Sequence, residues 1–117
     1  MIKVYGIKTC GTYKKGIKYF KDNNIEITTF DLKETVPTKE EMKQYHKLSG
    51  LDIKKFFNTS GKVYRELELK DKYKEMSLDE IYELLANNGM LIKRPLVIFN
   101  DKVLVGFKEE LYDEVFK

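Results

Sequence analysis

The sequence has few of the residues that form disulfides or bind metals in many small proteins, with one cysteine and one histidine in 117 residues. It also has only two prolines and no tryptophan. A single cysteine excludes an internal disulfide, and one histidine among scattered carboxylates has no metal-ligand spacing, so we expect no metal site. No apolar run approaches the roughly 18 residues of a membrane span, and no charged-then-apolar leader precedes Ile2. Without an export signal, the expected location is the reducing cytoplasm.

The charges are nearly balanced, with 22 basic and 19 acidic residues and a formal net charge of +3. Both signs alternate along the chain, which is typical of a solvated surface, whereas a nucleic-acid footprint gathers lysine and arginine on one face. We therefore expect neither nucleic acid nor membrane as a partner. A hydrophobic content of 42% with eight tyrosines and seven phenylalanines indicates a globular chain, and its length predicts one domain over residues 1–117, expected to be a monomer.

The cysteine falls where a strand is expected to pass into a helix. The apolar run Ile2–Tyr5 predicts a buried strand, and a helical spacing of apolar residues predicts a helix over Gly11–Asp22. The residues that carry this spacing are Tyr13, Ile17 and Phe20. Cys10 is thereby expected at the helix N-terminus, where free backbone N–H groups and the helix dipole favour a thiolate.

Cys10 is therefore the candidate nucleophile, with Lys8, Lys14 and Lys15 adding positive charge nearby. The alternative, a small apolar residue with no chemical role, stays open at this point. His46, beside Tyr45 in a predicted helix, is interpreted as structural.

The first third of the chain has the order strand, helix, strand, because residues Glu26–Leu32 have strand character. Such a crossover makes the two strands parallel. Two capping boxes, Thr38 with Glu41 and Ser77 with Glu80, then predict helices that end near residues 50 and 87. Between them we expect a short helix near residues 51–57, a turn at 58–61 and an irregular or briefly helical link over 70–76. Leu48 and Leu78 are expected on the buried faces.

In the last third of the chain, the hydrophobic pattern changes from helical spacing to the continuous apolar runs of buried strands. Pro95–Phe99 predicts a buried strand, Asn100 and Asp101 a turn, Lys102–Val105 an antiparallel partner, and Lys108–Phe116 a helix with Leu111 facing inward. The order β-α-β…β-β-α predicts an α/β fold of the thioredoxin-like (glutaredoxin-like) class with a mixed four-stranded sheet. Its core would comprise residues 1–33 and 92–117, and residues 34–91 would form an inserted helical lobe.

Three separated motifs resemble the ArsC/Spx family. They are Lys8-Thr9-Cys10-Gly11-Thr12, Phe56-Phe57-Asn58-Thr59-Ser60-Gly61 and Leu91-Ile92-Lys93-Arg94-Pro95-Leu96-Val97, followed by Val105-Gly106-Phe107. The resemblance covers essentially the whole chain, and Spx/MgsR-like and arsenate-reductase-like proteins look closest.

In the arsenate reductases of this family, the matching cysteine attacks arsenate and arginines bind the oxyanion. Arg94 matches one of these arginines, but Asn58 and Gly106 stand where the others would be. Fewer guanidinium groups imply a weaker clamp on a tetrahedral oxyanion.

The Spx branch pairs its cysteine with a second one three residues later, where this chain has Tyr13, so a Cys-x-x-Cys switch cannot form. A Spx-like contact with the RNA polymerase α subunit stays open. What the resemblance implies is a monothiol site like that of the glutathione-dependent thiol reductase branch. Cys10 would be the nucleophile, Arg94 and the first helical turn at Gly11 and Thr12 would hold an anion, and an external thiol such as glutathione, or a redoxin, would resolve the adduct.

The sequence therefore favours a thiol-dependent oxidoreductase, with an arsenate reductase proper and a Spx-like regulator as alternatives. Pro95, cis by the family resemblance, together with Asn58 and Lys14, is expected to shape the site. The plainer alternatives are that Arg94 is a surface cation, that Lys14 is a solvated helix residue and that Asn58 belongs to an ordinary turn.

Overall fold

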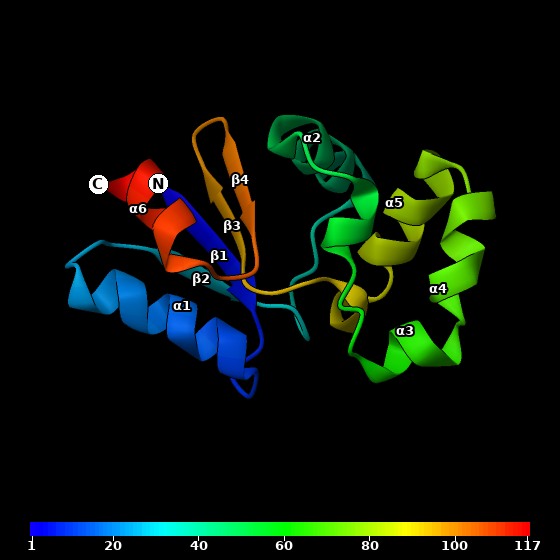
Figure 1. Cartoon of the computed structure of the whole chain (residues 1–117), viewed down its shortest axis with the longest axis horizontal. Helices are drawn as coiled ribbons and strands as arrows, with labels where there is room; N and C mark the ends of the chain where they lie inside the picture. Colours follow the sequence, from blue (N-terminus) through cyan, green and yellow to red (C-terminus); the bar gives the residue numbers. More distant parts are fainter.

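The computed structural model describes all 117 residues and contains one mixed sheet with the strand order β2-β1-β3-β4 (Figure 1). β1 (Ile2–Gly6) pairs in parallel with β2 (Thr28–Asp31) and antiparallel with β3 (Leu96–Phe99), which pairs antiparallel with β4 (Lys102–Val105). The thioredoxin-like fold class is confirmed. β2 is shorter than expected because only the four positions from Lys3 to Gly6 of β1 pair with it.

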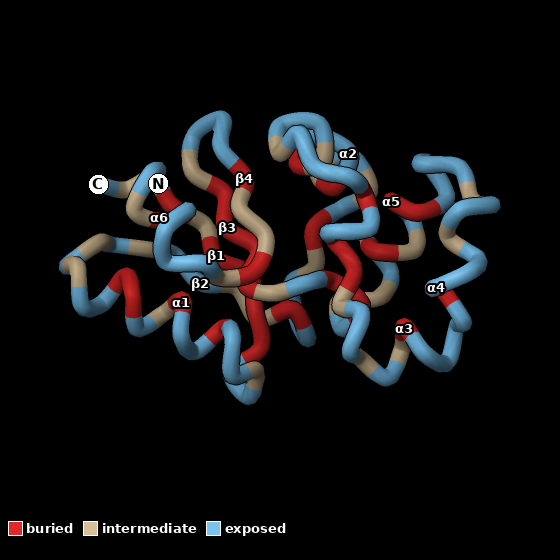
Figure 2. Tube along the Cα trace, viewed as in Figure 1, coloured by how far each residue is buried: buried red, intermediate tan, exposed pale blue.

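Each face of the sheet is covered by a different part of the chain (Figures 1 and 2). On one face α1 (Gly11–Asp22) and α6 (Glu109–Phe116) pack on Val4 and Val97, with Phe20 and Tyr112 fully buried between them. The other face carries Tyr5, Leu96 and Ile98 and packs on the helices that lie between β2 and β3. The alternation of side chains along β1 and β3 thus serves two separate hydrophobic clusters.

The segment between β2 and β3 is helical, as expected, with two short helices that the sequence did not indicate. Its elements are α2 (Lys39–Ser49), η1 (Ile53–Phe56), α3 (Lys62–Glu66), α4 (Leu69–Lys72), η2 (Tyr73–Glu75), α5 (Leu78–Ala86) and η3 (Gly89–Leu91). The unexpected elements are α3 and η3, which have five and three residues and neither a side-chain cap nor a hydrophobic repeat of their own.

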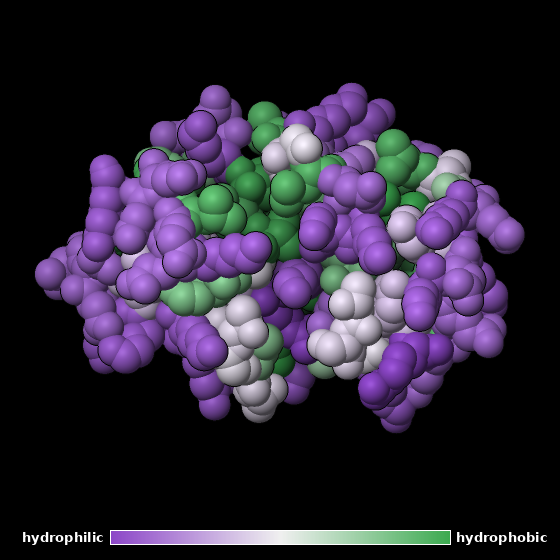
Figure 3. All heavy atoms as spheres, in the orientation of Figure 1, coloured by the Kyte–Doolittle hydropathy of each residue, from purple (hydrophilic) through white to green (hydrophobic).

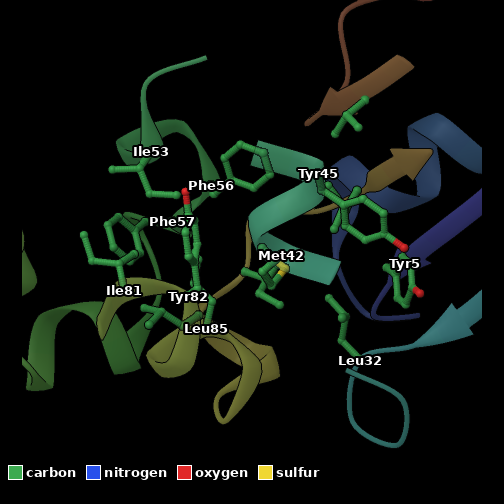
Figure 4. Close-up of a cluster of buried hydrophobic side chains, with 14 of the residues drawn as sticks. Tyr5, Leu32, Met42, Tyr45, Ile53, Phe56, Phe57, Ile81, Tyr82 and Leu85 are labelled. Carbon is green, nitrogen blue, oxygen red and sulfur yellow. The ribbon is translucent and has the colours of Figure 1, made fainter. Parts of the chain in front are cut away.

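A continuous core joins this helical lobe to the sheet. Figure 4 shows Met42 and Tyr45 of α2 between Tyr5 of β1 and the side chains of Tyr82 and Leu85 from α5. The cluster contains 18 buried residues contributed by the lobe and by three strands, so the two parts of the chain share one core. Because close-packed hydrophobic clusters cover both faces of the sheet, the ends of β1, β3 and β4 are held in defined positions.

Both predicted capping boxes are present, with Thr38 and Ser77 accepting from the backbone N–H of Glu41 and Glu80. Three leucines predicted to be buried are instead exposed: Leu48 at 40%, Leu78 at 48% and Leu111 at 45%.

The helical geometry explains two of these three errors. Leu48 is six residues from Met42, about 120° away around the helix. Leu78 is the first residue of α5, and its side chain leans toward the N-terminus, beyond the helix end. In α6 the residue that enters the core is Tyr112, the neighbour of Leu111. None of the helices has the length and apolar character that a membrane span requires.

Candidate functional site

Three chain segments meet at one edge of the sheet because of the strand directions. Tyr5 of β1 pairs with Leu96 of β3, which in turn pairs with Val105 of β4. The residues that follow β1, precede β3 and follow β4 therefore lie at the same edge. These are Cys10, the Arg94–Pro95 link and Gly106.

Cys10 is the N-cap residue of α1, as the sequence pattern predicted. Its backbone is extended, with φ −78° and ψ 122°, and its carbonyl accepts the first helical hydrogen bond from the N–H of Lys14 at 3.0 Å. The N–H of Cys10 donates to the carbonyl of Ile7 at 2.9 Å, which closes the turn after β1. The side chain is half-buried, and its sulfur makes no capping hydrogen bond to the helix.

The surroundings of Cys10 stabilise its thiolate. Burial raises the pKa of the thiol, but the backbone N–H groups of Tyr13 and Thr12 and the Arg94 guanidinium lower it further than burial raises it, so the pKa falls below its ordinary value. Cys10 makes no capping hydrogen bond to the helix. The free N–H groups at the positive end of the helix therefore stabilise the thiolate more than the neutral thiol. The sulfur is thus suited to act as a nucleophile.

Arg94 lies beside this sulfur with part of its donor capacity unused. One guanidinium nitrogen, Nη1, donates to the carbonyl of Met90 at 3.0 Å, which ties the side chain to the turn before β3. The Nε–H is buried and has no hydrogen-bond partner. A buried donor without a partner costs free energy, which favours a negative charge close to the guanidinium, such as the Cys10 thiolate. The Arg94–Pro95 peptide bond is cis, as the family resemblance implied.

A small set of contacts holds Pro95 against the helix that carries Cys10. A side-chain carbon added at Gly16 would lie 3.1 Å from Cγ of Pro95, so only a glycine fits without displacement. The carbonyl of Pro95 accepts from the N–H of Gly106 at 2.9 Å, and the buried Tyr112 hydroxyl donates to the carbonyl of Gly106 at 2.8 Å. Gly106 has φ +81°, a conformation that favours glycine.

The sequence reasoning missed Gly16 and Tyr112 as supports of the site. A glycine in the middle of a good helical pattern costs about 1 kcal/mol relative to alanine and often marks a close approach, which is the signal that was available.

Tyr13 occupies the position of the second cysteine in the Spx-like pattern. Its ring is buried and packs directly on Gly6, where any side chain would overlap it. Burial raises the pKa of Tyr13, with a smaller upward contribution from Asp31 and a downward one from Thr29. The residue fills space between α1 and the sheet.

The other residues singled out from the sequence occupy different places. Gly11 and Thr12 form the exposed first turn of α1, and the Lys14 side chain is exposed. Asn58 donates its N–H to the carbonyl of Leu91 at 2.7 Å and accepts from the Ser60 hydroxyl at 3.3 Å. No hydrogen bond joins Asn58 to Cys10, so it supports the segment that leads to Arg94.

Cys10 is only partly buried, and Gly11 and Thr12 beside it are exposed. A cavity of about 560 Å³ lies at the opposite end of β1, where Met1, Ile2 and Phe99 line it, and so has no part in the site. No group of three or more histidine, cysteine or carboxylate side chains comes together anywhere in the fold. His46 bridges the Tyr82 hydroxyl at 2.6 Å and the carbonyl of Leu51 at 2.9 Å within the lobe, which gives it a structural role.

Comparison with known proteins identifies relatives across the whole chain. The model of the ArsC family matches residues 5–115. The uncharacterised protein YusI of Bacillus subtilis is 52% identical over 110 residues, which cover 94% of this chain and 93% of YusI. A crystal structure of an ArsC family related protein from Bacteroides fragilis superimposes with a TM-score of 0.94 at 46% identity, covering 97% of this chain and 96% of the other.

Two further relatives have names that point in different directions. A possible arsenate reductase from Streptococcus mutans has a TM-score of 0.92 at 38% identity, and the match covers 99% of this chain and 98% of that one. The regulatory protein MgsR of Bacillus subtilis is 28% identical over 103 residues, 88% of this chain and 80% of MgsR.

Proposed function

This chain belongs to the ArsC family, and from that premise we propose that it is a thiol-dependent oxidoreductase with Cys10 as its single nucleophile. The observation that carries the proposal is Arg94, placed beside a thiol of lowered pKa with a buried Nε–H that lacks a partner. A thiolate next to an unused cationic donor is suited to attack a disulfide whose substituents are negatively charged.

The proposed reaction is a pair of thiol–disulfide exchanges. The Cys10 thiolate attacks one sulfur of a mixed disulfide, a new bond forms between Cys10 and that sulfur, and the other half leaves as a thiolate. A second external thiolate, from glutathione or a redoxin, then attacks the outer sulfur of the adduct, which releases Cys10 as a thiolate and yields a new disulfide. Each exchange moves one electron pair, so no further oxidant or reductant is required.

The residues around the sulfur have separate parts in this scheme. The N–H groups of Thr12 and Tyr13 stabilise Cys10 whenever it carries charge, before attack and again as a leaving group. Arg94 does the same, and its guanidinium would in addition attract an anionic group of the incoming thiol. Lowering the pKa of Cys10 also makes it the better leaving group in the second step.

The experiment that tests this proposal is incubation with oxidised glutathione, followed by mass spectrometry of the intact chain and of its peptides. We expect one glutathione on Cys10, its release by reduced glutathione or a glutaredoxin, and no adduct on the Cys10→Ser variant. A Cys10 that forms no adduct with any disulfide at neutral pH would contradict the proposal.

Arsenate reduction is the first alternative, and the name of the Streptococcus mutans relative favours it. With Asn58 and Gly106 where the family's reductases place arginines, we expect turnover that is absent or far below that of a true reductase. The measurement is arsenate-dependent consumption of reducing equivalents at micromolar arsenate with glutathione and glutaredoxin. Robust turnover would mean that other cations, such as Lys54 or Lys108, supply the missing charge.

A regulatory role through contact with the RNA polymerase α subunit is the second alternative, favoured by the similarity to MgsR over 88% of this chain. Such a role would depend on the surface, because Tyr13 is buried where a second cysteine would be needed for an internal switch. Co-purification of tagged protein with the polymerase, in both the wild type and the Cys10→Ser variant, would support this alternative over the oxidoreductase.

A further inference from the structure

A groove of about 390 Å³ lies between the helical lobe and the sheet, and four lysines line it. Lys54 and Lys55 come from the lobe, and Lys93 and Lys108 come from the segments that flank β3 and β4. Leu51 and Leu111 provide exposed apolar surface in the same lining. Figure 3 shows the face of the molecule in Figure 1, with apolar atoms in its middle and hydrophilic side chains on both sides. We refer to this feature as the lysine groove.

The charges of the lysine groove are uncompensated. No carboxylate lines it, and none of its four lysines forms an ion pair. Five other lysines of the chain are paired with carboxylates, namely Lys18, Lys39, Lys62, Lys72 and Lys117. In a chain whose net charge is only +3, four unpaired ammonium groups around one concave surface create a local positive potential that attracts anions.

The lysine groove adjoins the thiol site through two short segments. Lys93 lines the groove and its neighbour Arg94 acts on Cys10, while consecutive Cα atoms are only about 3.8 Å apart. A side-chain carbon at Gly106 would lie 3.2 Å from Cε of Lys93, so the lysine stem runs over Gly106. Gly106 in turn donates to the carbonyl of Pro95. The groove therefore borders the segment that carries Arg94 and Pro95, the same segment that acts on the Cys10 sulfur.

We propose that the lysine groove binds the anionic groups of the low-molecular-weight thiol that reacts at Cys10, an inference that rests on the function proposed above. Its volume falls in the usual range for small-molecule sites, about 300–1,000 Å³, and is too small for a folded partner domain. Ammonium groups are compact point charges that donate hydrogen bonds to carboxylates and to phosphates. The occupant is thus a thiol with at least two negative groups besides its sulfur, whose stem lies along Leu51 and Leu111.

The test compares two quadruple variants that lose the same charge. The groove variant replaces Lys54, Lys55, Lys93 and Lys108 by glutamine, and the control variant replaces four exposed, unpaired lysines of the lobe, Lys43, Lys47, Lys70 and Lys74. Both change the formal net charge from +3 to −1. All eight side chains are exposed, so both variants should fold, which circular dichroism verifies.

The rate of Cys10 modification is measured with three disulfides: oxidised glutathione, which carries carboxylates, coenzyme A disulfide, which carries phosphates, and the neutral hydroxyethyl disulfide. We expect the groove variant to react about tenfold more slowly with one or both anionic disulfides, equivalent to about 1.4 kcal/mol, and the control variant to react like the wild type. The neutral disulfide should react equally with all three proteins. The anionic disulfide that is slowed identifies carboxylate or phosphate as the recognised group.

Equal slowing of both variants would show only general attraction and would overturn the inference, and so would equal slowing with the neutral disulfide. If no disulfide reacts with Cys10 at all, the proposed function fails, and the groove is tested separately on the Cys10→Ser protein. S-methylglutathione or S-methyl coenzyme A should then shift the amide resonances of Lys93 and Lys108, and the groove variant should abolish these shifts. Binding of a polyglutamate peptide without binding of either thioether would overturn the inference in favour of an acidic protein segment.

Discussion

The contact between Gly16 and Pro95 offers a direct test of how the fold positions the thiol site. Gly16 lies in the middle of α1, six residues after Cys10, and a methyl group there would lie 3.1 Å from Cγ of Pro95. Replacing Gly16 by alanine therefore adds one methyl group at the point where the helix that follows Cys10 touches the segment that carries Arg94.

Two opposing contributions decide the effect of this substitution on stability. Alanine in place of glycine in a helix interior contributes up to about 1 kcal/mol to the free energy of unfolding. Overpacking a buried contact costs about 1–3 kcal/mol, and Pro95 has little freedom to move because its carbonyl is bonded to Gly106. We expect Gly16→Ala to destabilise the protein, by up to about 2 kcal/mol, and to move Arg94 away from Cys10.

The assay combines urea unfolding with the rate at which Cys10 reacts with oxidised glutathione. The control is Gly11→Ala, in the same helix, where an added methyl group meets no atom within 4 Å and stability should be unchanged or slightly higher. A Gly16→Ala protein that is more stable than the wild type and reacts at the same rate would refute the reasoning, because it would show that the close approach of α1 to Pro95 is of no consequence.

Three further predictions follow from the geometry of the site. Arg94→Gln should raise the pKa of Cys10, seen as a shift of the ultraviolet thiolate absorbance to higher pH, and an unchanged titration would make Arg94 an ordinary surface cation. Because folding lowers the pKa of Cys10, the unfolded chain binds more protons between the folded and unfolded pKa values. The free energy of unfolding of the wild type relative to Cys10→Ser should therefore grow as the pH rises through the folded pKa toward the unfolded value of about 8.5, and a difference independent of pH would contradict this. Tyr112→Phe leaves the carbonyl of Gly106 without its buried hydroxyl donor and should lower the free energy of unfolding by about 1–3 kcal/mol in urea titrations, whereas a loss below about 0.5 kcal/mol would mean that water replaces the hydroxyl.

Local patterns accounted for the elements that build the thiol site. The helix over Gly11–Asp22 was predicted with its observed bounds, because its hydrophobic spacing is regular and its N-terminus follows a clear strand and turn. Both capping boxes formed, since each depends on residues only three positions apart. The patterns failed where helices are short or where exposure depends on neighbours, as α3 and Leu111 show.

Residues that support the thiol site through contacts with distant parts of the chain are harder to recognise in the sequence. Tyr112 follows ordinary helical spacing, and its hydrogen bond to Gly106 depends on how α6 returns over the sheet. Gly16 is unusual in a helix, but the sequence does not tell which residue approaches it. Asn58 was expected to shape the site at Cys10, and what the structure adds is its N–H bond to the carbonyl of Leu91, since the chain from Phe56 to Asn58 pairs with the segment before Arg94.

The sequence by itself identified the candidate nucleophile and the local part of its electrostatic setting, because the backbone N–H groups that act on a cysteine at the start of a helix belong to Thr12 and Tyr13, close by in the chain. Only the tertiary structure decided what surrounds that group. Arg94 reaches Cys10 because β3 runs antiparallel to β1, and the lysine groove exists because the lobe packs beside β4. Strand order and lobe packing result from pairing between residues far apart in the chain, which no periodicity within one segment encodes.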